Sequence, residues 1–467
     1  MRARYMLVAG ALVASLAACT TSGPDANGDG GGGKGDGKTL TMWTTEDVQD
    51  RVQAMKKIAG DFTTKTGIKV NVVAVAEDQF DQVMTSAAAE GKLPDVIAAL
   101  QPEGVQSLAV NDLLDTTTPG EIVKDLGANT FSPAALKLTQ QPDGTQLAVP
   151  SDAWTQLLFY RKDLFAKAGL AAPDTFGKIT AAAQKLTSGG TAGIAISTTP
   201  GDAFTQQSFE YFALGNGCQL VDTSGKILLD SPPCVDTFRF YNDLATKYSV
   251  KGNQDVDTTR ANYFAGKTAM VVWSSFLLDE LAGLRNDALP TCPECKNDPG
   301  FLAKNTGVIG PVSGPSGRPT QFGQVVSWAI TRDANKSAAK QFVEYMMNDA
   351  YVDWLGLAPE GKVPTRKGTP QDPQKFVQAW SGLKAGVDKK EPLSSVYSPD
   401  VINTITTGAD KFDRWGFAQG KGALIGATQG ELPVPKAINN MVNGGTPEKA
   451  AQQATSAVQD IEKSVDK

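Results

Sequence analysis

Histidine is absent from the 467 residues of the chain. This absence excludes histidine-based catalytic triads, imidazole general bases and histidine-ligated metal sites. Carboxylates, Lys, Tyr and Cys can still support catalysis, so an enzyme is disfavoured rather than excluded. The chain also lacks an excess of positive charge, because 44 Lys and Arg residues stand against 50 Asp and Glu residues and the formal charge is −6. We therefore expect no nucleic-acid partner.

Phosphate-binding loops are missing as well. Neither Gly-x-Gly-x-x-Gly nor Gly-x4-Gly-Lys-[Ser/Thr] occurs where a predicted strand leads into a helix, so a nucleotide-dependent enzyme has no support. We expect neither a cofactor nor a metal ion. Apolar residues still make up 41% of the chain, which is enough for a large core. At about 100–200 residues per domain, the length predicts two or three domains.

The first nineteen residues resemble a bacterial lipoprotein signal. Two arginines precede an apolar stretch, residues 5–18, that is shorter than the roughly 20 residues a membrane-spanning helix needs. The stretch runs into LAAC at residues 16–19, which resembles a lipobox. The resemblance implies a signal peptide over residues 1–18, cleavage before Cys19, diacylglyceryl attachment to its sulfur and acylation (palmitate) of the new amine. The alternative is an ordinary secretory signal followed by an unrelated cysteine.

Residues 19–38 are expected to form a lipidated tether. The segment 23–38 holds eight glycines in sixteen residues and no bulky apolar side chain. Burial cannot offset the entropy of ordering such a segment, so we expect a flexible linker. Together with a lipid on Cys19, this linker would hold the folded body at the extracellular face of the bacterial cell membrane.

Four cysteines remain in the folded body: Cys218, Cys234, Cys292 and Cys295. An even number in an exported protein favours disulfides, and four cysteines allow three connectivities. We favour Cys218–Cys234 and Cys292–Cys295 because the members of each pair are close in sequence. The Cys-Pro-Glu-Cys segment could instead be a redox or metal site, but the absence of histidine and of a second Cys-x-x-Cys disfavours zinc.

The folded body begins with an alternation of strands and helices. Short apolar runs at 40–43, 68–73 and 94–100 read as strands, and the segments between them carry apolar residues at helical spacing. This alternation predicts an α/β fold with a parallel, doubly wound sheet. Ligands bind at the carboxyl ends of such strands, which lie here near residues 43–47, 77–79 and 101–103.

The segment VPSDAWTQLLFYRKDLFAKAGL at residues 149–170, with the PDTF that follows at 173–176, resembles the extracellular solute-binding proteins of bacterial ABC sugar importers. Three further segments resemble that maltose-binding-protein-like family in the same order: FAGKTAM at 264–270, a strand and helix over 321–345, and VPTR at 363–366. The matches run from about residue 39 to 467. The four cysteines, and a phenylalanine at 176 where tryptophan is commoner, depart from the family pattern.

The resemblance implies a two-lobe periplasmic-binding-protein-like fold with a hinge and an interlobe ligand cleft. Lobe 1 would comprise residues 39–151 and 325–352, and lobe 2 residues 152–324 and 353–467. The hinge would lie near 150–156 and 322–328. The implied function is the substrate-binding component of an ABC transporter, a monomer that captures a neutral mono- or oligosaccharide without turnover and delivers it to the transmembrane permease subunits.

Candidate ligand residues follow from the chemistry of a sugar, whose hydroxyl rim suits polar side chains and whose C–H faces suit aromatic ones. The aromatic candidates are Trp43, Trp154, Phe204, Trp273 and Trp415. The polar candidates are Glu46, Asp47, Glu103, Asp152 and Asp202. Capping of the helix that follows is an equally good role for Asp47. We expect Trp328, Trp354 and Trp380 in the core.

Two other functions remain open at this point. A polyamine-binding protein would use the same fold, with carboxylates facing a cation and aromatic rings around its methylene groups. A glycosidase would use a carboxylate pair such as Glu46 and Asp152 as acid and nucleophile.

Overall fold

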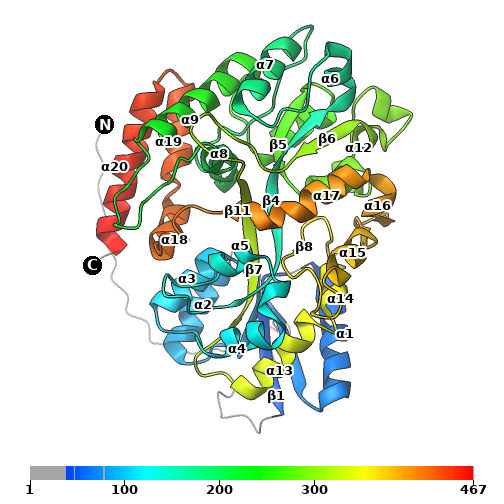
Figure 1. The fold of residues 1–467 in the computed structure, drawn as a ribbon, viewed down its shortest axis with the longest axis vertical. Helices are drawn as coiled ribbons and strands as arrows, with labels where there is room; N and C mark the ends of the chain where they lie inside the picture. Colours follow the sequence, from blue (N-terminus) through cyan, green and yellow to red (C-terminus); the bar gives the residue numbers. More distant parts are fainter. Residues whose placement is uncertain (1–37, 47, 77–78, 466–467) are drawn as a thin grey trace, which may run out of the picture. The chain divides into compact units, whose positions relative to one another are not determined.

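The computed structural model describes residues 38–46, 48–76 and 79–465 (Figure 1). The predicted signal peptide, the lipidation site Cys19, almost all of the tether and the candidate Asp47 lie outside the described residues. No helix within the described part of the chain has the length and apolar character needed to cross a membrane.

The first elements follow the predicted α/β alternation. They are β1 (Thr39–Thr44), α1 (Gln49–Thr66), β2 (Lys69–Ala74), α2 (Phe80–Glu90) and β3 (Val96–Leu100). Helix α1 buries Val52, Met55, Ile58, Ala59 and Phe62, which recur every three or four residues along one side. It ends at Gly67, whose left-handed φ of 76° suits glycine. β1 pairs in parallel with both β2 and β3, as predicted.

The main sheet is mixed rather than wholly parallel. Its strand order is β2-β1-β3-β7-β4-β5. β7 (Gln321–Ile330) runs antiparallel to β3 and to β4 (Val149–Arg161). The prediction of a parallel sheet is therefore correct for β1 to β3 and wrong beyond them. The α/β alternation covers only the first three strands. β7 comes much later in the chain and enters the sheet from the opposite end.

The two parts of strand β4 pair with different strands. Residues 149–155 pair with β7, whereas residues 156–161 pair with β5 (Met270–Ser274) and β6 (Thr306–Ile309). The chain thus passes between the two halves of the sheet on β4 and β7 (Figure 1). A third segment, β8 (Val363–Pro364), lies beside them and pairs with β4 at Asp152 and Ala153.

The other elements surround these strands. Between β3 and β4 in the chain lie α3 (Pro102–Val110), α4 (Thr118–Asp125) and α5 (Pro133–Leu138), and between β7 and β8 lie α13 (Lys336–Met347) and α14 (Tyr351–Leu355). Between β4 and β7 lie α6 (Lys162–Ala168), α7 (Phe176–Leu186), α8 (Ala203–Gly215), α9 (Pro232–Asp243), α10 (Val256–Phe264), α11 (Leu277–Leu281) and α12 (Phe301–Asn305). After β8 come α15 (Lys375–Ser381), β9 (Lys384–Ala385), β10 (Glu391–Pro392), α16 (Leu393–Val396), α17 (Pro399–Gly408), β11 (Phe412–Asp413), α18 (Gly422–Glu431), α19 (Pro433–Val442) and α20 (Pro447–Val465).

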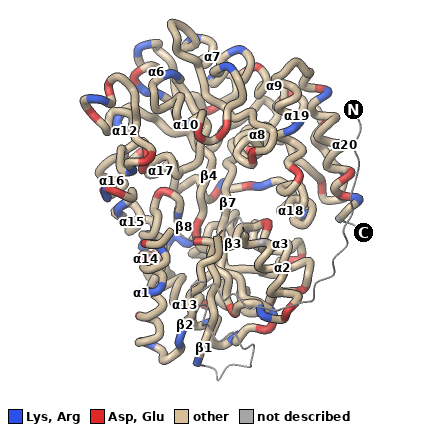
Figure 2. Tube along the Cα trace, turned by 180° about the vertical axis from the view of Figure 1, so that it is seen from behind, with Lys and Arg blue, Asp and Glu red and all other residues tan. Residues whose placement is uncertain are grey.

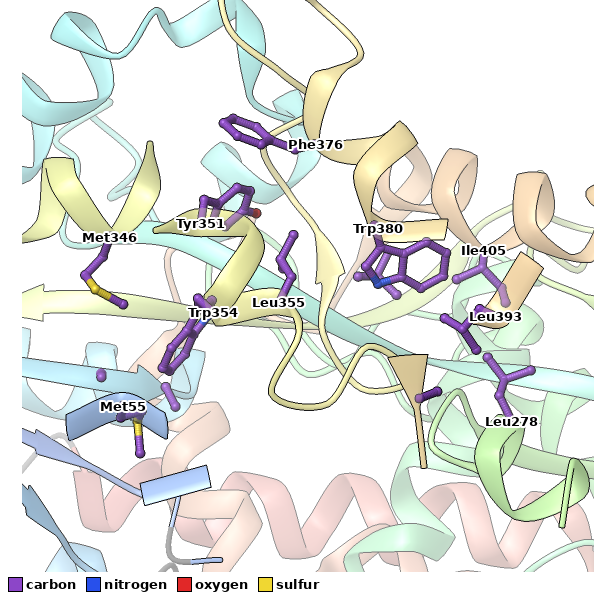
Figure 3. Packing of buried hydrophobic residues seen from close by; sticks show 14 of the residues in the cluster. Met55, Leu278, Met346, Tyr351, Trp354, Leu355, Phe376, Trp380, Leu393 and Ile405 are labelled. Carbon is purple, nitrogen blue, oxygen red and sulfur yellow. The ribbon is translucent and has the colours of Figure 1, made fainter. Parts of the chain in front are cut away.

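The largest buried cluster contains the three tryptophans predicted to be core. Trp328, Trp354 and Trp380 are fully buried, which confirms that prediction. Figure 3 shows Trp354 and Trp380 among members of this cluster that run from Met55 to Ile405. Trp354 also bonds to a site residue described below, so its replacement would affect more than packing.

Both predicted disulfides are present, Cys218–Cys234 and Cys292–Cys295. All four cysteines are buried. The first bond joins the segment after α8 to the first turn of α9, across a sequence separation of 16 residues.

Replacing Cys218 and Cys234 together by Ala should lower the free energy of unfolding by about 3 kcal/mol, because a crosslink closing about 15 residues restricts the unfolded chain by that amount. Urea unfolding monitored by circular dichroism measures the change. The Cys292→Ala/Cys295→Ala variant is the matched control and should lose less, since its loop spans a separation of only 3 residues. Equal losses in the two variants would contradict the loop-length argument.

Candidate functional site

One face of β4 carries an aromatic side chain between two polar ones. Asp152, Trp154 and Gln156 alternate along the strand and therefore share a face. Trp154 lies opposite Gln324 of β7 in the ladder, and Phe322 of β7 belongs to the same face. The rings of Trp154 and Phe322 are 5.7 Å apart. Trp154 is partly exposed, whereas Asp152 and Gln156 are buried.

The amino-terminal end of α3 reaches this face from the first half of the sheet. Gln324 Nε2 donates to Gln101 Oε1 and to Glu103 Oε2, each at 2.9 Å. Both acceptors follow the end of β3, the edge at which the α/β pattern predicts a ligand. Ala99, just before them, has a left-handed φ of 57° beside a register shift against β7, and such strained backbone is common near functional sites.

A buried arginine connects α3 to α8. Arg414 Nη2 donates to Glu103 Oε1 at 2.8 Å, and its Nε donates to Glu210 Oε1 at 3.0 Å. The guanidinium carbon lies 4.4 Å from the centre of the Phe322 ring. Burial alone would lower the pKa of Arg414, but Glu210 and Glu103 outweigh it and hold that pKa above its ordinary value. Arg414 is therefore charged at every physiological pH.

A second buried cation lies at the other end of the face. Lys362 Nζ is 2.8 Å from Glu46 Oε1 and 3.6 Å from Asp152 Oδ2. The Trp354 indole N–H donates to Asp152 Oδ1 at 2.6 Å, and Lys362 Nζ lies 4.2 Å from the centre of that indole ring. Although burial raises it, Lys362 and Arg51 bring the pKa of Glu46 down to about 2. Glu46 is therefore ionised, and it forms ion pairs with Lys362 and Arg51.

The segment between β4 and β7 adds Phe276, which directly precedes α11, and Gln207 of α8. The Phe276 ring is 6.5 Å from Trp154, and Gln156 Nε2 donates to Gln207 Oε1 at 3.4 Å. Several buried polar atoms around Trp154 lack a hydrogen-bond partner among the described residues: Gln156 Oε1, Gln324 Oε1 and Arg414 Nη1. A buried polar atom without a partner costs about 1–3 kcal/mol. Ligand hydroxyl groups can supply such partners, so the arrangement suits a ligand with an apolar face and several hydroxyls.

The structure brings four of the predicted residues together around this face: Glu46, Glu103, Asp152 and Trp154. Trp43 lies on β1, on the face of the strand opposite to that of Leu40 and Met42. Its side chain packs against the buried cluster that includes residues of α2, α3 and β3. It is partly exposed. Its side chain therefore leaves β1 on the side opposite to α1.

Three other predicted residues form a separate group. Asp202 Oδ1 accepts from the Phe204 backbone N–H at 2.9 Å and caps α8. The Phe204 ring is 5.8 Å from Trp273, whose indole N–H donates to the Val256 carbonyl at 3.1 Å. Trp273 lies opposite Leu157 of β4, so it leaves the sheet on the face away from Trp154 and Gln156.

Trp415 lies in the core. Its side chain is 1% exposed, and its indole N–H donates to the Cys218 carbonyl at 2.8 Å. A stacking role on a ligand does not fit this burial. The neighbouring residue Arg414 points the other way and contacts Glu103 and the Phe322 ring of the candidate site.

Sequence reasoning missed several residues of the site. These are Gln156, Gln207, Phe276, Phe322, Gln324, Lys362 and Arg414. The alternation of β4 past the hinge is a signal that could have found Gln156, since it follows Asp152 and Trp154 at every second position. Lys362 stands just before the VPTR segment used for the resemblance, and nothing local distinguishes it from a surface lysine.

The charged residues of the described chain are of both signs throughout, and Figure 2 shows acidic and basic residues interspersed along it. Among the described residues, no group of three or more His, Cys, Asp or Glu side chains is arranged to hold a metal ion.

Comparison with known proteins shows which family the chain resembles. The profile of the bacterial extracellular solute-binding protein family matches residues 57–385. The putative ABC transporter periplasmic-binding protein YcjN of Escherichia coli (strain K12) is 28% identical over 327 residues, which cover 68% of this chain and 71% of that protein. The sn-glycerol-3-phosphate-binding periplasmic protein UgpB of Brucella abortus (strain 2308) is 28% identical over 155 residues, 31% of this chain and 35% of that protein.

Solved structures show the same fold. The sugar-binding protein MalE of Xanthomonas citri superposes with a TM-score of 0.69 at 18% identity, covering 91% of this chain and 97% of that one. This likeness identifies the two-lobe periplasmic-binding-protein-like α/β fold. Because the family profile matches most of its length, the chain belongs to the bacterial extracellular solute-binding proteins.

Proposed function

We propose that this protein is the substrate-binding component of an ABC transporter and captures a neutral mono- or oligosaccharide. The observation that carries the proposal is the partly exposed Trp154 ring, surrounded by buried polar atoms of Gln156, Gln324 and Arg414 that lack partners among the described residues. An aromatic ring covers the apolar face of a sugar, and such polar atoms bond its hydroxyls. The sugar-binding neighbour MalE supports the same ligand class.

The charge balance of the site favours a neutral ligand over a phosphate ester. Arg414 is held by two carboxylates, Glu103 and Glu210. Lys362 likewise lies between Glu46 and Asp152. With all the acids ionised, the Arg414 group carries one negative charge in excess. Arg51, which pairs with Glu46 at 3.2 Å, makes the Lys362 group neutral, so neither group offers a phosphate a cation that is not already paired. Glycerol 3-phosphate, the ligand that the name of UgpB gives, is therefore disfavoured here.

The same contacts argue against a glycosidase and a polyamine-binding protein. A glycosidase acid needs a raised pKa and access to the substrate, whereas the pKa of Glu46 is lowered to about 2. Burial raises the pKa of Asp152, but its side chain is 1% exposed and cannot reach a glycosidic bond. Asp152 is engaged by Trp354 and Lys362. Neither carboxylate is free to act as catalyst or to bind a cationic ligand.

Calorimetric titration with a ligand panel tests the proposal. The panel holds neutral mono- and oligosaccharides, glycerol 3-phosphate and spermidine. Saturable binding of at least one neutral saccharide, with intact sugar recovered afterwards, is the expected result. Preferential binding of glycerol 3-phosphate or spermidine, or hydrolysis of the saccharide, would overturn it.

We also propose closure of two lobes around the ligand. Lobe 1 would comprise residues 39–151 and 325–352, and lobe 2 the remainder of the folded body. The support is that β4 and β7 carry the chain between the two halves of the sheet, so bending near 150–156 and 322–328 would move one half against the other. The closed monomer would then deliver its sugar to the permease subunits.

Attachment by lipid at Cys19 completes the proposal. The LAAC sequence at residues 16–19 and the glycine-rich segment behind it support an anchor at the extracellular membrane face. The wild-type protein should partition into the detergent phase of a detergent–water separation, and Cys19→Ser should move it to the aqueous phase or leave it unprocessed. A wild-type protein found wholly in the aqueous phase would rule out the anchor.

A further inference from the structure

Helix α18, in the proposed lobe 2, packs against α3 of lobe 1. The two helices come close because α18 carries no side chain at the contact. A Cβ atom on Gly422 would lie 2.2 Å from Gln106 Cγ, and one on Gly426 would lie 4.0 Å from the Glu103 carbonyl oxygen. Since residues four apart share one side of a helix, α18 turns a glycine side toward α3.

The segment that leads into α18 makes another close approach to lobe 1. A Cβ atom on Gly420 would lie 2.4 Å from Pro142 Cγ, and the φ of Gly420 is 71°. Glycine adopts this left-handed conformation without the strain that other residues suffer. Pro142 belongs to the segment between α5 and β4. Glycines therefore allow lobe 2 to approach lobe 1 at two separate points.

An ion pair joins the two lobes beside these glycines. Arg414 Nε donates to Glu210 of α8 at 3.0 Å, within lobe 2, and its Nη2 donates to Glu103 of α3 at 2.8 Å, in lobe 1. The side chains of Arg414 and Glu210 are each 1% exposed, whereas that of Glu103 is 14% exposed. Arg414 is thus fixed in its own lobe, and its bond to the more accessible Glu103 is the one that opening of the lobes would break.

This interlobe contact lies on the ligand side of the hinge strands. Glu103 Oε2 accepts from Gln324 at 2.9 Å, and the Arg414 guanidinium carbon is 4.4 Å from the centre of the Phe322 ring. Gln324 and Phe322 belong to the same face of the sheet as Trp154. A contact on this side of a hinge forms when the lobes close over a ligand and separates when they open.

We propose that α3 and α18 form a latch that holds the lobes closed over the Trp154 site, and that Gly422 and Gln106 set the ligand affinity through this latch. They are positioning residues, since they act through closure rather than through contact with the ligand. The effect on affinity rests on the proposed function, whereas the effect on closure is measured without ligand.

The size of the effect follows from the population of the closed form. A ligand that binds only the closed form has an apparent dissociation constant equal to the intrinsic constant divided by the closed fraction. A side chain wedged between α3 and α18 lowers that fraction. A fall in the closed fraction from near one to about one tenth would weaken binding about tenfold.

Gly422→Val places a branched side chain where Gln106 lies and tests the proposal. Small-angle X-ray scattering of the ligand-free full chain should give a larger radius of gyration than in the wild type. Calorimetric titration with the best saccharide of the panel should show an affinity about tenfold weaker. Gly430→Val is the matched control, because it makes the same change on the same helix at a position with no atom within 4 Å of the new Cβ. It should alter neither quantity.

A compensating change distinguishes the latch from a general defect in α18. Gln106→Ala removes the atoms that the valine would meet, so Gly422→Val/Gln106→Ala should regain the wild-type radius of gyration and most of the affinity. Gln106→Trp enlarges the same contact from α3. It should reproduce the effects of Gly422→Val and serves in its place if that variant does not fold.

Three outcomes decide between the possibilities. A radius of gyration and an affinity that stay at wild-type values in both Gly422→Val and Gln106→Trp would overturn the latch. A loss in Gly422→Val that Gln106→Ala does not restore would overturn it as well. If the radius of gyration responds as expected while no saccharide of the panel binds the wild type, the latch is supported and the proposed ligand class is wrong.

Discussion

Replacing Trp154 by Ala should weaken saccharide binding by about 5- to 150-fold. Stacking of an aromatic ring on a flat ligand contributes about 1–3 kcal/mol, and each 1.4 kcal/mol is tenfold in affinity. Trp154 is the partly exposed ring at the centre of the polar atoms that lack partners. Calorimetric titration with the best saccharide of the panel measures the loss, and the melting temperature should change little because the ring is not fully buried.

Trp415→Ala is the matched control for this prediction. Its side chain is 1% exposed, so truncation should cost about 3–5 kcal/mol of stability through the cavity it leaves, while the affinity of the folded fraction stays near wild type. Trp273→Ala tests whether the ligand binds beside Trp154 or at the separate group that contains Phe204 and Trp273. If Trp273→Ala abolishes binding and Trp154→Ala does not, the ligand lies against Phe204 and Trp273 instead.

The first half of the fold could be predicted because its signals are local. The apolar spacing of α1, the left-handed Gly67 and the buried run of β3 each depend on neighbouring residues only. The antiparallel pairing of β7 with β3 and β4 joins residues that are far apart in the sequence, such as Thr155 and Gly323. Such pairing leaves no local trace, so the alternation pattern alone predicted too many parallel neighbours.

The same distinction explains the site. Glu46, Glu103, Asp152 and Trp154, which the structure brings together at the candidate site, could be proposed from the sequence because strand ends and the hinge segment can be located along it. Lys362 and Gln324 could not be found in this way, because each acquires its role from partners that only the folded chain brings near. Trp415 and Arg414 are adjacent in sequence and point in opposite directions, and only tertiary packing decides which of them faces the site.

Arg414→Met should destabilise the protein by about 3–5 kcal/mol, the usual cost of removing one partner of a buried ion pair. The reason is that Glu210, 1% exposed, would lose its only cationic partner among the described residues, while Glu103 would keep Gln324 and some exposure to solvent. Urea unfolding at pH 8 measures the loss. Acid would reduce it, because an unpaired buried carboxyl takes up a proton more readily and then needs no counter-charge.

Two variants distinguish the ion pair from simple packing. Arg414→Met/Glu210→Gln should recover a large part of the loss, because the remaining buried groups are then neutral. Glu103→Gln alone should cost less than Arg414→Met, since Arg414 retains Glu210. If Arg414→Met loses as much at pH 5 as at pH 8 and Glu210→Gln restores nothing, then the guanidinium stabilises this region through its contact with the Phe322 ring rather than through its charge.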